Sequence, residues 1–227
     1  MTDAQKEILL STPLFRGIAP TDADALLTCL APTLRTVPRE GTVLAAGDAP
    51  RYVGVLFSGE VHIVHDDYWG NRSILSAVLP GDVFGEAFAL GAAAVLPVSA
   101  LARRDSCVLL MDSRRMLTVC PSPCAAHTAL LRNLIAVLAG KNIALTDKIR
   151  HISKRTTRAR VMSYLSEAAA AAGKNTFLIP FDRQEMADYL AVERSALSAT
   201  LSEMQADGLI SFRKNRFTLH AEIGEKP

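Results

Sequence analysis

The sequence predicts an α+β protein made of an N-terminal antiparallel β-roll, a long middle helix, and a C-terminal helix pair with a β-hairpin. Three observations lead to this prediction. Short alternating apolar runs, separated by turn residues, fill positions 42–111. An apolar heptad repeat extends over positions 131–152. Two helical apolar stripes between 182 and 207 precede two short strands around a basic turn.

The composition is that of a globular protein. Of the 227 residues, 49% are hydrophobic and 21% are charged, which suits two modest domains. No apolar run reaches about eighteen residues, and the first ten residues lack the pattern of a signal peptide. We therefore expect no membrane span. The four cysteines show no disulfide spacing, which indicates reduced thiols and a cytoplasmic location. They are Cys29, Cys107, Cys120 and Cys124.

The charge is divided unevenly along the chain. Residues 1–112 hold 8 lysines and arginines against 13 aspartates and glutamates, a formal charge of −5. Residues 113–227 hold 17 against 10, a formal charge of +7. The C-terminal half is therefore the half that suits a polyanion.

The N-terminal part changes its apolar period near Arg35. Residues 1–34 are predicted to be helical in pieces, with Thr21 capping the second piece. Beyond them the period is two, and the predicted strands are 42–44, 53–57, 61–64, 73–78 and 107–111. Their turns carry Glu40-Gly41, Gly47-Asp48, Ser58-Gly59, Gly70-Asn71 and Pro80-Gly81. Many short, evenly spaced strands indicate an antiparallel roll or sandwich.

The middle helix carries a heptad that indicates a dimer seam. The seam residues are Leu131, Leu138, Leu145 and Ile152 at d, and Ile135, Asn142 and Ile149 at a. Isoleucine at a with leucine at d favours a parallel two-stranded coil, and one asparagine at a fixes its register. A single amphipathic helix packed on its own roll is the alternative. We expect Leu130, Leu134 and Val137 to cover the roll while the heptad faces a second copy.

The segment 182–207 has the spacing of a helix-turn-helix. Asp182 and Glu185 form a capping-box pair at the start of the first helix. The second helix is predicted from about Arg194 to Asp207, before Gly208. Its outer face is thin enough to enter a major groove. An ordinary helical hairpin shares this spacing, but the basic hairpin that follows favours DNA binding. The expected DNA-binding residues are Gln184, Arg194, Ser195, Ser198, Ala199, Ser202, Arg213, Lys214 and Arg216.

A basic segment joins the middle helix to this region, with only Asp147 opposing it. It contains Lys148, Arg150, Lys154, Arg155, Arg158 and Arg160. A solvated helix end and a set of phosphate contacts both fit such a run. The expected domain boundaries are 1–118 for the roll, 119–152 for the dimerisation helix and 153–221 for the DNA-binding part.

A family resemblance adds to these patterns. The glycine-containing motifs stand in the order of the cyclic-nucleotide-binding fold: Gly41, Gly47-Asp48, Val55-Leu56, Ser58-Gly59-Glu60, Val61 and Pro80 to Glu86. With the helix-turn-helix, the chain resembles a transcription regulator of the Crp/Fnr family from about Leu14 to Leu219. The resemblance implies an effector-binding β-roll, a long dimerisation helix and a C-terminal winged helix-turn-helix.

One departure from the family bears on the effector. Members that bind cyclic AMP present an Arg-Ser pair to its phosphate after Phe-Gly-Glu, but residues 94–100 hold no arginine. Glu86 would match the ribose-binding carboxylate. We therefore expect a smaller or more apolar ligand than cyclic AMP. Tyr68-Trp69 is expected either to shield that ligand or to pack on the roll or a partner. The expected pocket residues are Phe84, Gly85, Glu86, Phe88, Val98, Ser99, Leu130 and Leu134.

Metal binding is not expected from the cysteines and histidines. Only Cys29 lies near the N-terminus, so no iron–sulfur cluster is expected. Cys120 and Cys124 enclose two prolines and have no neighbouring histidine or carboxylate to complete a site. His62 and His65, three apart on a strand, point to opposite faces.

These features predict a homodimeric DNA-binding transcription regulator that a small molecule controls. One alternative is a protein of the same fold with weak or lost specific DNA binding, because only Arg194 is a long base-reading side chain. A haem- or redox-sensing member is another. No nucleophile–base pair, metal set or phosphate-binding glycine loop indicates an enzyme. The expected partners are double-stranded DNA, a second copy of the chain, a small-molecule effector and RNA polymerase, without a membrane.

Overall fold

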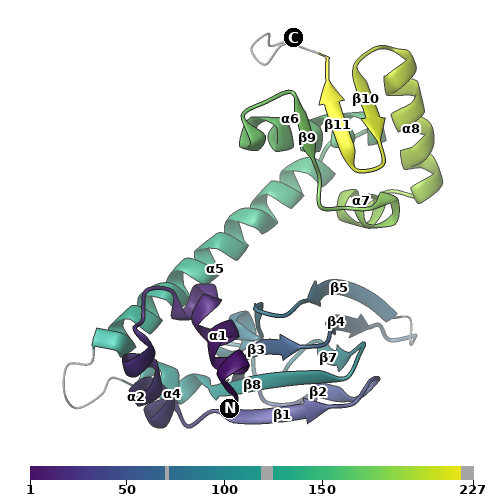
Figure 1. Cartoon of the computed structure of the whole chain (residues 1–227). Coiled ribbons are helices and arrows are strands. Elements are labelled where there is room, and N and C mark those ends of the chain that lie inside the picture. The colour runs from purple at the N-terminus through teal and green to yellow at the C-terminus, as the bar shows by residue number, and fades with distance from the viewer. Residues whose placement is uncertain (70–71, 119–124, 221–227) are drawn as a thin grey trace. The chain divides into compact units, whose positions relative to one another are not determined.

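The computed structural model describes residues 1–69, 72–118 and 125–220 (Figure 1). The chain forms two compact units, one from Met1 to Gly140 and one that begins at Lys141. Helix α5 (Ala125–Ile152) contributes residues to both units. The described fold is α+β, as predicted.

The described part of the first unit contains short helices and eight strands. The helices are α1 (Asp3–Ser11), a 3-10 turn η1 (Pro13–Phe15), α2 (Pro20–Leu30), α3 (Glu86–Ala89) and α4 (Ser113–Leu117). The strands are β1 (Thr33–Val37), β2 (Thr42–Leu44), β3 (Tyr52–Ser58), β4 (Val61–Asp66), β5 (Arg72–Val78), β6 (Val83–Phe84), β7 (Ser99–Ala102) and β8 (Ser106–Asp112). The five strands expected from the sequence are therefore confirmed.

Two antiparallel sheets form the roll. Their strand orders are β1-β8-β3-β6 and β2-β7-β4-β5. The sequence prediction missed β1, β6 and β7. Strand β1 begins at Thr33, inside the segment expected to be helical, because α2 ends at Ala31 with a left-handed φ of 42° and Pro32 follows. Strand β8 then pairs with β1 along all five residues of β1.

The central strands of the first sheet, β3 and β8, are buried on both faces, whereas four of the five residues of β1 are exposed. Val53, Val55 and Phe57 of β3 pack with α1, α2 and α5, which Figure 1 shows along one side of the roll. Leu56, on the opposite face of β3, belongs to a separate cluster between the two sheets. Gly54 also faces that cluster, where an added Cβ would stand 2.3 Å from the Phe84 ring. The alternation of β3 thus separates two cores.

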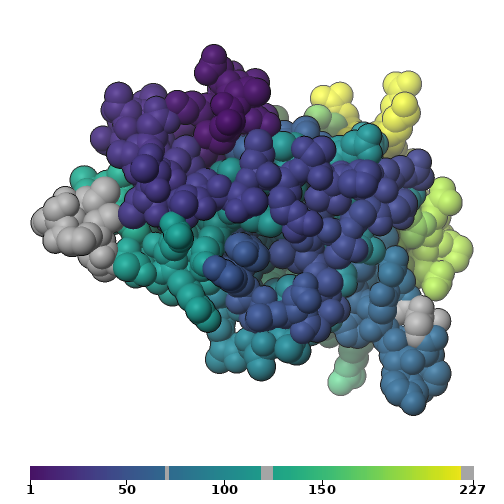
Figure 2. All heavy atoms as spheres, turned by 90° about the horizontal axis from the view of Figure 1, so that it is seen from below, coloured from purple at the N-terminus to yellow at the C-terminus, as the bar shows by residue number. Residues whose placement is uncertain are grey.

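The hairpin of β4 and β5 stands out from the roll, as its blue atoms show in Figure 2. Strand β5 is an edge strand with Ile74 and Leu75 61% and 55% exposed. Tyr68 and Trp69 are 95% and 82% exposed, and their rings meet edge to face at 5.8 Å. Both side chains are therefore largely exposed to solvent in the single chain. The turn residues Gly70-Asn71 lie outside the described residues.

The second unit holds the predicted helix-turn-helix and hairpin. Its elements after α5 are α6 (Thr157–Ala172), β9 (Thr176–Leu178), α7 (Arg183–Leu190), α8 (Arg194–Ala206), β10 (Ile210–Arg213) and β11 (Arg216–Leu219). The three strands form one antiparallel sheet in the order β10-β11-β9. Leu197, Leu201 and Met204 of α8 are fully buried in its core, as the predicted stripe requires.

Helix α5 leaves much apolar surface exposed. By length and composition alone, α5 is long and apolar enough to cross a membrane, a test that core helices of soluble proteins also pass. In its most apolar window, 11% of the residues are buried. The sequence analysis expected no membrane span because it looked for an uninterrupted apolar run, which polar residues such as Asn142 break. The mean hydropathy of a window tolerates such residues, so α5 passes that criterion. Leu130 and Leu134 are 0% and 2% exposed in the roll's outer core, so their predicted place against the roll is confirmed.

Candidate nucleic-acid interface and sensor roll

Local chemistry determines where the helix-turn-helix begins. The backbone N–H of Glu185 donates to Asp182 Oδ1 at 2.8 Å, and the backbone N–H of Asp182 donates to Glu185 Oε2 at 2.6 Å. The predicted capping box is confirmed. Helix α7 ends at Ala191, which has a left-handed φ of 51°. Alanine is strained in this conformation because of its Cβ, whereas glycine adopts it freely.

Arg160 of α6 holds the turn between α7 and α8. Its guanidinium donates to the carbonyl oxygens of Leu190 and Ala191 at 3.2 and 2.8 Å. Its Nε donates to the carbonyl oxygen of Lys154 at 2.9 Å. The cation therefore satisfies the last carbonyls of α7 and fixes them to the segment after α5.

The exposed face of α8 brings together the five residues expected to enter the major groove. Arg194, Ser195, Ser198, Ala199 and Ser202 are all exposed on this helix. Two of the serine hydroxyls bond to their own helix: Ser198 Oγ donates to the Arg194 carbonyl at 3.0 Å, and Ser202 Oγ to the Ser198 carbonyl at 3.1 Å. Arg194, at the first position of α8, is the long cationic side chain of this face.

The wing and the start of α7 supply further exposed polar groups. Arg213, Lys214 and Arg216 are exposed at the β10–β11 turn, where Lys214 has a left-handed φ of 56°. Asn215 Nδ2 donates to the Ile179 carbonyl at 3.2 Å, which ties this turn to the chain after β9. Gln184 is exposed, and its Nε2 donates to Asp188 Oδ1 at 2.8 Å.

The sequence analysis missed Arg183, the first residue of α7. Its guanidinium carbon lies 4.9 Å from the ring centroid of Phe212 and 5.8 Å from that of Phe217. Burial lowers the pKa of its guanidinium, which nevertheless stays charged at neutral pH. The cation therefore joins α7 to the wing. The Asp-Arg-Gln order at the start of α7 was visible in the sequence, but the partners of Arg183 lie on strands distant in sequence.

The basic segment forms more ion pairs within the chain than its composition indicated. Arg150 pairs with Glu167 as well as with Asp147. Arg158 pairs with Asp207 at 2.6 Å. The interpretation that only Asp147 opposes this segment was wrong, because Glu167 and Asp207 are brought to it by α6 and α8.

The seam residues of α5 are accessible in the single chain. Ile135, Leu145 and Ile149 are 66%, 57% and 53% exposed. Asn142 is exposed, and Leu131, Leu138 and Ile152 are half-buried. Exposed apolar surface of this extent is typical of interaction surfaces.

The expected effector residues fall in more than one core cluster. Phe84 belongs to the cluster between the sheets, whereas Leu130 and Leu134 belong to the cluster on the outer face of the first sheet. Phe88 is half-buried, Val98 is 8% exposed, and Ser99 Oγ accepts the Ala46 N–H at 2.9 Å.

Gly85 and Glu86 stay together at the start of α3. Gly85 has a left-handed φ of 80°, and an added Cβ would stand 2.8 Å from the Tyr52 carbonyl oxygen. Glu86 is 4% exposed. A carboxyl group held this far from water is unusual in a protein core.

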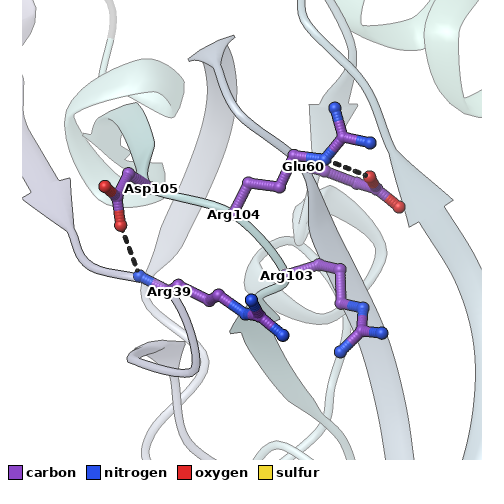
Figure 3. A pocket seen from close by; sticks show the side chains of 5 residues that line it. All are labelled: Arg39, Glu60, Arg103, Arg104 and Asp105. Carbon is purple, nitrogen blue, oxygen red and sulfur yellow. Dashed lines mark hydrogen bonds and ion pairs between the residues drawn. The ribbon is translucent and has the colours of Figure 1, made fainter.

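A depression of 510 Å³ lies at the roll end formed by three turns (Figure 3). It is lined by Arg39, Glu60, Arg103, Arg104 and Asp105. Arg104 pairs with Glu60 at 3.4 Å, and the Arg39 N–H donates to Asp105 Oδ1 at 2.8 Å. Glu40, at its edge, lies 3.3 Å from Arg103 and 3.4 Å from Arg39. Three carboxylates thus balance three guanidiniums, which leaves no excess positive charge for an anion.

No cluster of three metal-ligating side chains occurs among the described residues. His62 Nε2 lies 2.7 Å from Glu60 Oε1, and Cys107 Sγ accepts from Gln5 Nε2 at 3.4 Å. Cys29 is exposed on α2. Cys120 and Cys124 lie outside the described residues.

Comparisons with known proteins agree with this geometry. The cyclic nucleotide-binding domain matches residues 34–122, and the Crp-like helix-turn-helix domain matches residues 159–222. The transcriptional regulator LdrP of Thermus thermophilus is 27% identical over 190 residues, which are 82% of this chain and 91% of LdrP.

Two solved structures share the fold. FixK2 from Bradyrhizobium japonicum is 24% identical with a TM-score of 0.52, and the match covers 84% of this chain and 93% of FixK2. The c-di-GMP responsive global regulator CLP from Xanthomonas campestris is 17% identical with a TM-score of 0.59, over 90% of this chain and 100% of CLP.

A cyclic nucleotide-binding domain followed by a Crp-like helix-turn-helix domain defines a sensor joined to a DNA-binding module. The chain belongs to the Crp/Fnr family of transcription regulators, and the resemblance found in the sequence is confirmed. Its relatives are transcription regulators, which agrees with the expectation that it is not an enzyme.

Proposed function

We propose that the chain acts in the cytoplasm as a homodimer, binds an operator with two half-sites, and is controlled by a small molecule in the roll. The exposed face of α8, with Arg194 at its first position, is the observation that carries this proposal. RNA polymerase is a further partner if the regulator acts as an activator.

Arg194 is the residue that we assign to base reading. The N-terminal end of a recognition helix approaches the bases most closely. An arginine there is able to donate two hydrogen bonds to guanine, worth about 1–3 kcal/mol of discrimination. Ser195 and Ser198 discriminate weakly, and Ala199 offers a methyl group suited to thymine. Each half-site should therefore contain one strongly required G·C pair, with the half-sites roughly 34 Å apart.

Selection from random-sequence duplexes, followed by affinity measurements on selected and random DNA, tests this assignment. Arg194→Ala should remove the preference at the G·C pair and leave binding to random DNA almost unchanged. Arg213→Ala should weaken both duplexes alike and lower the salt slope by about one. Equal loss on both duplexes from Arg194→Ala would mean that Arg194 contacts phosphate only. Failure to select any duplex would favour a protein with lost specific binding.

The α5 seam is the surface that we assign to the dimer. Ile149 at a and Ile143 outside the heptad are a matched pair, since they are 53% and 62% exposed on the same helix. Ile149→Glu should give a monomer in sedimentation equilibrium, because it places a charge in the seam. Ile143→Glu should remain a dimer. If both variants, or neither, became monomeric, the seam would lie elsewhere.

The effector that we propose is not cyclic AMP. A buried phosphate requires a bidentate guanidinium, and residues 94–100 offer none. Arg103 and Arg104 are close to Glu40 and Glu60 instead. Glu86 is retained for a hydroxyl or amine of the ligand. Calorimetry should show no binding of cyclic AMP at micromolar concentration, and a micromolar dissociation constant would contradict the proposal.

A further inference from the structure

The last turn of α5 carries a buried histidine, His151, which is 1% exposed. Its Nδ1 lies 2.9 Å from Ser163 Oγ of α6, and its Nε2 lies 3.4 Å from Glu167 Oε2. Its ring meets Tyr164 of α6 edge to face, with centroids 5.8 Å apart. The ring of Tyr189 on α7 lies 6.3 Å away. One imidazole thus contacts both helices that precede the recognition helix.

Aromatic packing extends this contact. Tyr164 and Tyr189 have ring centroids 5.4 Å apart, and Phe181 lies 4.9 Å from Tyr189 and 5.8 Å from Tyr164. Lys148, one turn before His151 on α5, lies 5.5 Å from the Tyr189 ring centroid. All three rings pack against the core of the second unit. We call His151, Tyr164, Phe181 and Tyr189 the joint.

We propose that the joint fixes the orientation of the helix-turn-helix on the end of α5, and that His151 holds it as the neutral imidazole. His151 is then a positioning residue, because it acts on DNA only through α6 and α7. The proposal deepens the proposed function, since orientation affects affinity only when the paired helix-turn-helix modules must fit an operator.

The surroundings of His151 disfavour its charged form. The charged groups around it are Asp147, Lys148, Arg150, Lys154 and Glu167. Burial lowers the pKa of His151 more than the nearby carboxylate of Glu167 raises it. Glu167 also pairs with Arg150, which limits its attraction for a second cation. Burial raises the pKa of Tyr164 to about 12 and that of Tyr189 above its usual value, so both phenols stay neutral.

The lowered pKa of His151 determines the direction of the pH dependence. A histidine whose pKa in the folded protein lies below about 6.5 binds protons more weakly when folded than when unfolded. Its contribution to the joint is present above about pH 6.5 and is lost as the pH falls through the folded pKa. Each unit of pKa lowering corresponds to about a tenfold change in the equilibrium. Acid should therefore loosen the joint.

A loosened joint should affect selected and random DNA differently. A specific duplex requires both modules in one arrangement, so orientational freedom lowers its affinity. Random DNA is bound through phosphate contacts that tolerate many arrangements. The ratio of the two affinities therefore reports on the joint and cancels general effects of pH on charge.

The test uses the full chain, a duplex selected by the wild-type protein, and a random duplex, at about pH 7.5 and about pH 5. The wild-type affinity ratio should fall severalfold in acid. The glutamine of His151→Gln does not titrate, so this variant should show the same affinity ratio at both pH values. His151→Lys should give the low ratio at both. His65→Gln, which alters an exposed histidine of the roll, should behave as wild type. A wild-type pH response in His151→Gln, or an unchanged ratio in His151→Lys, would overturn the proposal.

A second measurement needs neither DNA nor a variant. Hydrogen exchange of the wild-type protein, corrected for the intrinsic effect of pH, should show faster opening in acid for the peptides of the joint. Peptides from β8 in the roll should show no such change. Equal protection of the joint at both pH values would overturn the proposal even if His151→Gln failed to fold. If no duplex could be selected, the proposal of specific operator binding would be refuted. Hydrogen exchange would still test the proposal about the joint.

Discussion

Replacing Arg160 with alanine tests the brace between α6 and the helix-turn-helix. The change removes three hydrogen bonds from one guanidinium to the carbonyl oxygens of Lys154, Leu190 and Ala191. Hydrogen bonds that involve a charged group contribute about 1.5–3 kcal/mol each in mutational series. Only the bond to Leu190 is partly buried, and water replaces the other two in part. Loss of the cation from the end of α7 adds about 0.3–1 kcal/mol.

We therefore expect Arg160→Ala to lower the free energy of unfolding of the second unit by about 2–3 kcal/mol. Arg158→Ala is the matched control, because Arg158 lies on the same helix and pairs with Asp207 between groups that are 47% and 50% exposed. An exposed ion pair contributes about 0–1 kcal/mol. Urea unfolding followed by circular dichroism measures both variants. If Arg160→Ala lost no more stability than Arg158→Ala, the carbonyl contacts of Arg160 would not stabilise this unit.

Three further substitutions test backbone conformation, each measured by the change in unfolding free energy. Ala191→Gly should stabilise by about 0.5–1 kcal/mol, because φ is 51° there; a loss of stability would contradict the strain. Gly140→Ala should also stabilise by about 0.5–1 kcal/mol, since nothing lies within 4 Å of the new methyl group; no gain would indicate a hidden contact. Gly59→Ala should destabilise by about 2 kcal/mol or more, because φ is 89° and Cβ would meet the Asp105 carbonyl oxygen at 2.4 Å; a neutral result would refute this geometry.

The sequence by itself determined the features that depend on residues close together in the chain. The capping box joins Asp182 to Glu185, three residues apart, and the buried stripe of α8 repeats every three or four residues. The same holds for the alternation of β3 and for the exposed heptad of α5. Periodicity and capping are local, so their physical causes can be recognised without a fold.

Tertiary structure alone decided which distant groups meet. Strand β7, which no local pattern indicated, exists because β2 and β4 pair with it on either side. The expected effector residues were divided because Phe84 and Leu130 lie on opposite faces of one sheet. Arg158 belongs to a basic run for which a solvated helix end and phosphate contacts were both left open, and it pairs with Asp207, 49 residues away in the sequence. His151 gave no signal in the sequence, since its burial depends on Tyr164 and Tyr189. Charges and rings interact through space, and their partners become known only when the chain has folded.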